Sequence, residues 1–162
     1  MTGARARHTI MRALLLLLAT GCATGASSYG SVSFKSFSNA GARPASFSVG
    51  KGEVVGSGLD LREDQGCIRG SWGRIPLDFC RDDKGAGSAQ HWSGTSGQFA
   101  VTPSADSVAV RGELILDTLR IVSMDQDVRI GQGKQWDELR RHPALLAVAA
   151  TTADLVAIGL RR

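Results

Sequence analysis

The stretch CIRGSWGRIPLDFC, residues 67–80, decides the fold prediction, because independent features of it agree on one β-hairpin. A two-residue turn at Gly73-Arg74 places glycine first, as a type II′ turn requires. Counted outward from this turn, Pro76, Cys67 and Cys80 fall at non-hydrogen-bonded pairs. Pro76 then costs no ladder bond, and the opposed cysteine Cα atoms lie ~4.5 Å apart, at the short end of disulfide range. We therefore predict a Cys67–Cys80 disulfide; the alternative is two free thiols in a slipped hairpin.

The same register separates the two faces of the hairpin. One face carries Arg69 opposite Asp78, together with the two cysteines. The other face forms a continuous apolar patch, made of Ile68, Trp72, Ile75, Leu77 and Phe79. This alternation predicts one face packed on a core and one face in solvent.

The flanking sequence predicts a mainly β body. Twenty glycines interrupt short β-branched and aromatic runs, as is typical of an all-β domain. A small antiparallel sandwich or a partly open barrel is expected over residues 31–131. The expected strands are residues 31–37, 45–49, 53–62, a short one around 91–92 within the polar loop 81–96, 98–102, 107–116, 119–123 and 127–130.

A C-terminal helical segment is expected over residues 132–162. The sequence WDELRR, residues 136–141, favours helix, and Pro143 suits the first turn of a second one. From 144 to 160 an apolar set follows helical spacing, comprising Leu145, Val148, Ala149, Thr152, Leu155, Val156 and Gly159. A membrane span is the alternative, but Asp154 in its middle costs roughly 2.5–3.5 kcal/mol near a bilayer centre. We expect the helix to pack on the sheet or against a partner.

The first 22 residues have the zones of a secretory leader. Three arginines precede the apolar run 13–19, which is shorter than the about 20 residues of a membrane span. The run ends in Leu18-Ala19-Thr20-Gly21-Cys22, which resembles the lipobox of bacterial lipoprotein precursors. Ala19 stands where that family most often has leucine. The alternative is an ordinary secreted protein cut near this point.

The resemblance implies cleavage after residue 21 and attachment of lipid to Cys22. Residues 1–21 are then a signal peptide, and residues 22–30 form a lipidated tether. Lipid on Cys22 implies a membrane partner and a place in the cell envelope. Ala23 after the cysteine is the pattern that sends enterobacterial lipoproteins to the outer membrane. Because Cys22 carries the lipid, Cys67 and Cys80 remain as an even pair in an oxidising compartment.

Removing the leader also removes the apparent basicity of the chain. The whole chain has 19 basic and 15 acidic residues, and the leader contains three of the basic ones. The mature chain keeps 16 basic and 15 acidic residues, a formal net charge of +1. The composition therefore gives no support for a nucleic-acid partner.

Enzyme, cofactor and metal motifs are weak throughout. No P-loop, H-E-x-x-H motif or EF-hand loop is present, so no catalytic residue, cofactor or metal ligand is assigned. His91 beside Trp92 is the one constellation kept as a possible binding site. An exposed Trp92 would suit a glycan or peptide contact; the alternative places it over the sheet edge.

These observations predict a membrane-anchored envelope lipoprotein. A non-enzymatic binding or assembly module, with an envelope protein or glycan as partner, is the first hypothesis. An envelope hydrolase using His91 is the second, and an inhibitor of an envelope enzyme is the third. A carboxylate or hydroxyl within hydrogen-bond reach of His91 would favour the hydrolase.

Overall fold

The structure is a computed structural model, and it describes residues 28–35, 41, 43–82 and 87–159. Cys22, the leader and residues 22–27 of the expected tether lie outside the described residues. Within them, the chain forms eleven strands followed by two helices. The prediction of a mainly β body with a C-terminal helical segment is confirmed.

One antiparallel sheet contains all the described strands. Along most of it each strand pairs with its sequence neighbours, and β10 and β11 both pair with β9. No described strand joins β1 to β10 or β11, so the sheet is not closed into a barrel. The strands are β1 (Gly30–Phe34), β2 (Ala45–Gly50), β3 (Glu53–Gly56), β4 (Leu59–Asp64), β5 (Cys67–Trp72), β6 (Ile75–Asp82), β7 (Gln90–Gly94), β8 (Gly97–Pro103), β9 (Ser107–Asp117), β10 (Arg120–Ser123) and β11 (Gln126–Arg129).

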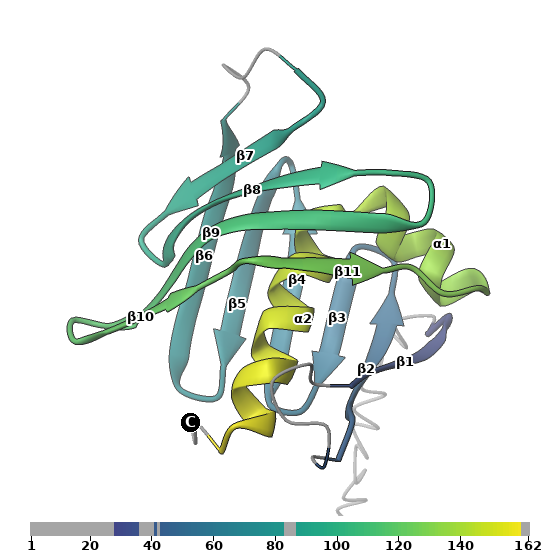
Figure 1. Cartoon of the computed structure of the whole chain (residues 1–162), viewed down its shortest axis with the longest axis horizontal. Helices are drawn as coiled ribbons and strands as arrows, with labels where there is room; N and C mark the ends of the chain where they lie inside the picture. Colours follow the sequence, from purple (N-terminus) through teal and green to yellow (C-terminus); the bar gives the residue numbers. More distant parts are fainter. Residues whose placement is uncertain (1–27, 36–40, 42, 83–86, 160–162) are drawn as a thin grey trace, which may run out of the picture.

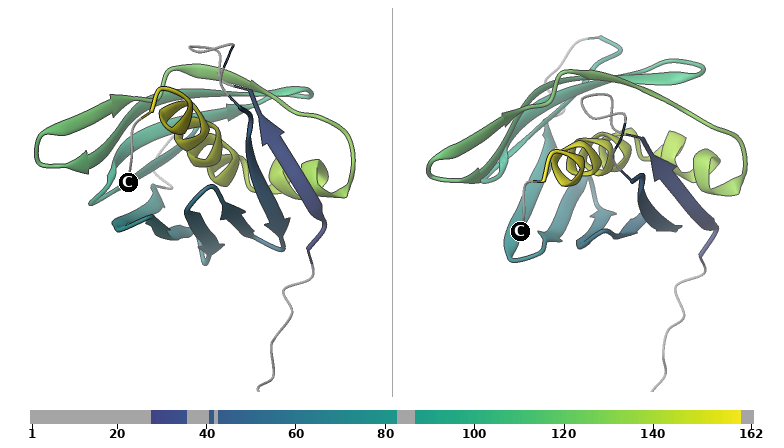
Figure 2. Two further views of the ribbon diagram at one scale, coloured as in Figure 1. Left: turned by 90° about the horizontal axis from the view of Figure 1, so that it is seen from below. Right: turned by 60° about the horizontal axis from the view of Figure 1, so that its bottom comes forward.

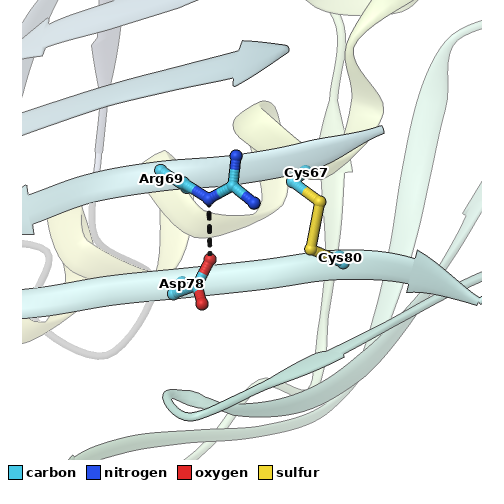
Figure 3. The surroundings of a disulfide bond; sticks show 4 residues. All are labelled: Cys67, Arg69, Asp78 and Cys80. Carbon is cyan, nitrogen blue, oxygen red and sulfur yellow. Dashed lines mark ion pairs between the residues drawn. A yellow bond between two sulfur atoms is a disulfide. The ribbon is translucent and has the colours of Figure 1, made fainter. Parts of the chain in front are cut away.

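The β5–β6 hairpin has the predicted register at all six pairs, from Trp72 opposite Ile75 to Cys67 opposite Cys80. The two cysteines form a disulfide with a Cα–Cα distance of 4.0 Å. On the same face Arg69 Nε lies 3.4 Å from Asp78 Oδ1 (Figure 3). The opposite face packs on the core, where Trp72 and its apolar neighbours are buried and Ile75 is half-buried.

The expected single strand over residues 53–62 is wrong. The structure divides it into β3 and β4, which pair as a hairpin around Ser57-Gly58. Both turn residues have positive φ, 48° at Ser57 and 76° at Gly58, as a type I′ turn requires. The sequence does not indicate this turn, because serine rarely adopts a positive φ. The inward orientation of Leu59 and Leu61 is confirmed, since both are buried.

The tether prediction also changes at its end. Ser28 Oγ lies 3.0 Å from Ser48 Oγ, and the Tyr29 N–H donates to the Val49 carbonyl at 2.8 Å. Both residues belong to the expected tether, 22–30, yet they extend the pairing of β1 with β2, and Gly30 is the first residue of β1 itself. Only residues before Ser28 remain as candidates for a tether.

The sheet bends sharply between β6 and β7. These strands pair only over 80–82 and 91–93. Beyond that point Ser96, from the β7–β8 turn, hydrogen-bonds the backbone of β6. Its Oγ accepts from the Asp78 N–H at 3.0 Å and donates to the Pro76 carbonyl at 3.2 Å. Gly94 permits the close crossing, because a Cβ there would lie 2.1 Å from the Asp78 carbonyl oxygen. Figure 1 shows the result, with β3–β6 running steeply across β8, β9 and β11.

Two helices follow the sheet, α1 (Lys134–Arg141) and α2 (Pro143–Ala157), with Pro143 in the first turn of α2 as predicted. Helix α2 lies between the two halves of the bent sheet (Figure 2). It contacts β2–β5 on one side and β8, β9 and β11 on the other. None of the described helices is long and apolar enough to span a membrane.

The expected one-sided apolar stripe of α2 is wrong in extent. Five of its predicted members, from Leu145 to Leu155, are buried, but so are residues on the remaining faces: Leu146, Ala147, Ala150, Thr151 and Ala153. Because sheet lies on both sides, no face of the middle of α2 is left for solvent. The Thr151 and Thr152 hydroxyls are satisfied inside the helix, donating to the Ala147 and Val148 carbonyls at 2.9 and 3.0 Å.

Candidate functional site

His91 lies in a row of side chains that crosses four strands on the outer face of the sheet. Strand pairing places Asp82, His91, Ala100 and Arg111 next to one another on β6, β7, β8 and β9. A second row on the same face runs from Cys80 through Ser93 and Gln98 to Glu113. The disulfide thus lies on the same outer face as His91.

A surface cavity of about 540 Å³ lies over these rows. This volume is within the range of about 300–1,000 Å³ typical of ligand pockets. The cavity combines polar side chains with Ala100, whose short side chain leaves room above the sheet. Its lining consists of Asp82, His91, Trp92, Ser93, Gln98, Phe99, Ala100, Arg111 and Gly112.

Arg111 forms one side of this cavity. Its guanidinium contacts two carboxylates, with Nε 3.1 Å from Asp125 Oδ1 and Nη2 3.2 Å from Asp127 Oδ1. Nη1 donates to the Val110 and Gln126 carbonyls at 2.7 and 3.1 Å. All three nitrogens have partners, so this arginine shapes the site more than it offers an unpaired cation to an anionic ligand.

Trp92 does not present its ring to solvent. It is 2 % exposed, and its ring stacks with that of Phe99 at a centroid distance of 6.4 Å. Its Nε1 is also buried and has no hydrogen-bond partner within the part of the chain that the structure describes. Trp92 therefore does not supply the exposed ring that a glycan or peptide contact would need. The ring belongs to the core, and it does not lie over a sheet edge as the alternative has it, because β7 pairs with both β6 and β8. His91 remains at the surface because adjacent residues of a strand point to opposite faces.

His91 is exposed, and its side chain forms no hydrogen bond or ion pair with the described residues. A catalytic histidine of a hydrolase is normally oriented by a carboxylate or hydroxyl. Asp82 pairs with His91 across β6 and β7, but the two side chains are not bonded to each other. The geometry suits a surface that supplies polar contacts to a ligand better than one that activates a nucleophile.

The structure contains a second polar cluster, around His142, that the sequence does not indicate. His142, between α1 and α2, has Nδ1 3.1 Å from Glu63 Oε2 on β4 and Nε2 3.3 Å from Glu138 Oε1 on α1. The Glu138 side chain is only 5 % exposed. Its oxygens also accept from the Gly52 N–H at 2.9 Å and from Arg141 Nη1 at 3.0 Å. This cluster ties the helical corner to β4 and to the turn between β2 and β3.

The protonated form of His142 is favoured by this environment. The close contact of Nδ1 with Glu63 raises the pKa of the imidazole, and the charges of Glu63 and Glu138 add to that effect against the opposing cost of burial. Only the Glu138 and His142 spacing, four residues apart, was visible in the sequence. Glu63 comes from a distant strand, so no local pattern indicates it.

No group of three or more His, Cys, Asp or Glu within the described ranges is arranged to hold a metal ion. In the His142 cluster the two carboxylates face opposite ring nitrogens, so they do not converge on one point. Comparisons with protein-family models, curated proteins and solved structures find no match for this chain.

Proposed function

We propose that this chain is a cell-envelope lipoprotein, anchored through lipid on Cys22, whose β body is a non-enzymatic binding or assembly module. The pairing of Cys67 with Cys80 is the observation that carries the proposal. Disulfides persist in oxidising compartments outside the cytoplasm, so this bond supports export. The pair also leaves Cys22 as the one remaining cysteine, directly after a leader that resembles a lipobox.

The binding role is supported by the outer face of β6–β9. The cavity there offers side chains that donate and accept hydrogen bonds, among them His91, Ser93 and Gln98. An envelope protein or glycan rich in hydroxyl and amide groups suits this lining. Arg111, which also lines the cavity, already contacts two carboxylates, and this disfavours a strongly anionic ligand. The pattern after Cys22 supports an outer-membrane location.

Labelling with a fatty-acid analogue tests the anchor. Cells that make the wild-type chain will incorporate the label into this protein, whereas Cys22→Ala will not, because the acceptor thiol is missing. The variant will also leave the membrane fraction, since stable anchoring needs the acyl chains. The control is Cys80→Ala, which removes a different thiol and will keep the label. Equal labelling of wild type and Cys22→Ala would rule out the anchor.

Site-directed photo-crosslinking tests the binding surface. A photoreactive residue in place of Ser93, which lines the cavity, will give a discrete adduct in intact cells. The adduct will disappear when Ala100→Trp fills the cavity floor. A probe at Thr118, in the exposed turn between β9 and β10, is the control and will not give that adduct. A Ser93 adduct that survives Ala100→Trp, or no adduct at all, would contradict a partner at this cavity.

A further inference from the structure

We propose that His142 is a proton-controlled clasp, which fastens the α1–α2 corner to β4 and to the β2–β3 turn while both of its ring nitrogens carry protons. The two nitrogens contact different elements: Nδ1 faces Glu63 of β4, and Nε2 faces Glu138 of α1. Glu138 in turn accepts from the Gly52 N–H in the turn. One imidazole therefore lies at the junction of three segments, and the proposal does not depend on lipid attachment or on any ligand.

The geometry favours the extra proton. A carboxylate oxygen only accepts hydrogen bonds, and a neutral imidazole has one N–H and one lone pair. With both nitrogens against carboxylate oxygens, a neutral ring would turn its lone pair toward one of them. Glu63 Oε2 and His142 Nδ1 are buried and have no hydrogen-bond partner among the described residues, so the ion-pair contact between them, at 3.1 Å, is what compensates their burial. Loss of the proton thus leaves buried polar atoms unpaired, which is costly.

The charged groups around the clasp come from every element packed against it. Glu138 and Arg141 lie on α1, and the exposed Arg141 guanidinium holds the other Glu138 oxygen. The cavity beside the imidazole, about 330 Å³, is lined by Lys51, Gly52, Arg62, Glu63, Asp64 and His142. Arg62 pairs with Glu53 on β3, which leaves Glu63 to His142. Because His142 opens on this cavity, protons can exchange with solvent without unfolding of the core.

The direction of the pH effect follows from the raised pKa of His142. When the pKa of a group is higher in the folded protein than in the unfolded protein, the group stabilises the fold fully at any pH below its unfolded pKa. For histidine that unfolded pKa is about 6.5. That contribution is lost as the pH rises through the folded value. The clasp is therefore closed in mildly acidic solution and opens on the alkaline side, where the turn at Gly52 and the end of β4 lose their attachment to α1.

Nuclear magnetic resonance on the full chain tests the clasp. Long-range proton–nitrogen spectra will show His142 protonated at both nitrogens at about pH 6 and titrating above the ordinary value of about 6.5. The Gly52 N–H, which binds Glu138, and the Glu63 N–H, which binds the Gly52 carbonyl, report on opening. Between about pH 6 and pH 9 their protection from exchange will fall by about tenfold for each unit by which the pKa is raised.

Three comparisons make the test specific. The Gly73 N–H, bonded to the Gly58 carbonyl in another turn, will keep its protection over the same pH range. The variant Glu138→Gln keeps the side-chain shape but removes one charge, and it will lower the pKa of His142. His91 is an exposed histidine without bonded partners among the described residues. The variant His91→Gln will therefore change neither the pKa of His142 nor the protection of the Gly52 and Glu63 amides. A wild-type His142 that titrates at or below the ordinary value, or equal loss of protection at Gly52 and Gly73, would overturn the proposal.

Discussion

Val148→Asp will leave the chain without a cooperative unfolding transition. Val148 is fully buried at the middle of α2, with sheet on both sides of the helix. A carboxylate there would be taken out of water and enclosed by the apolar core. Burial of an unpaired charge costs several kcal/mol or more, against a total stability of about 5–15 kcal/mol for a domain of this kind. Far-UV circular dichroism during urea titration will show no sigmoidal transition.

The matched control for this change is Ile158→Asp. Ile158 follows the same helix but is 54 % exposed, so the carboxylate stays in water. This variant will unfold within about 0.5 kcal/mol of the wild type, as surface substitutions usually do. If Val148→Asp unfolded at the wild-type urea concentration, α2 would not be the centre of the core.

Replacing Cys67 and Cys80 together by serine will lower the free energy of unfolding by about 3 kcal/mol. The disulfide closes a loop with a sequence separation of 13, and a loop of this length restricts the unfolded chain by about that amount. For a domain of this size the melting temperature will fall by about 10 °C. The fold itself will persist, since the β5–β6 register is also held by Ile68 and Phe79 in the core.

Chemical reduction and a neighbouring pair provide the controls. The wild type in excess reductant will melt with the double variant, because both lack the same bond. Arg69→Ala removes the adjacent ion pair, whose arginine is largely exposed, and will change stability by less than about 1 kcal/mol. A double variant as stable as the oxidised wild type would mean that the thiols are not bonded in the folded protein.

The β5–β6 hairpin could be predicted in detail because its constraints are local. Glycine at the turn, an opposed ion pair and an opposed cysteine pair all require one register, and the structure has that register. The β3–β4 turn could not be found in the same way. Ser57 adopts a positive φ that its residue type does not announce, and the neighbouring glycines also fit a continuous strand with a bulge.

The remaining features depend on contacts between residues that are far apart in the sequence, so local patterns do not predict them. Helical spacing correctly located α2, but only the bend between β6 and β7, held by Ser96, brings sheet onto both of its sides. Likewise, His91 lines a surface cavity made by four strands, and burial of Trp92 depends on Phe99 from the next strand. The His142 cluster needs Glu63, a residue far from it in sequence.

The position of α2 has a consequence for the order in which the protein can be made. The helix that fills the centre of the sheet is also the last described element of the chain. Strands β1–β11 leave the ribosome before the segment that covers their apolar faces exists. The hydrophobic centre of the described residues is therefore complete only after α2 has been made, so the emerging strands stay without their apolar cover until then.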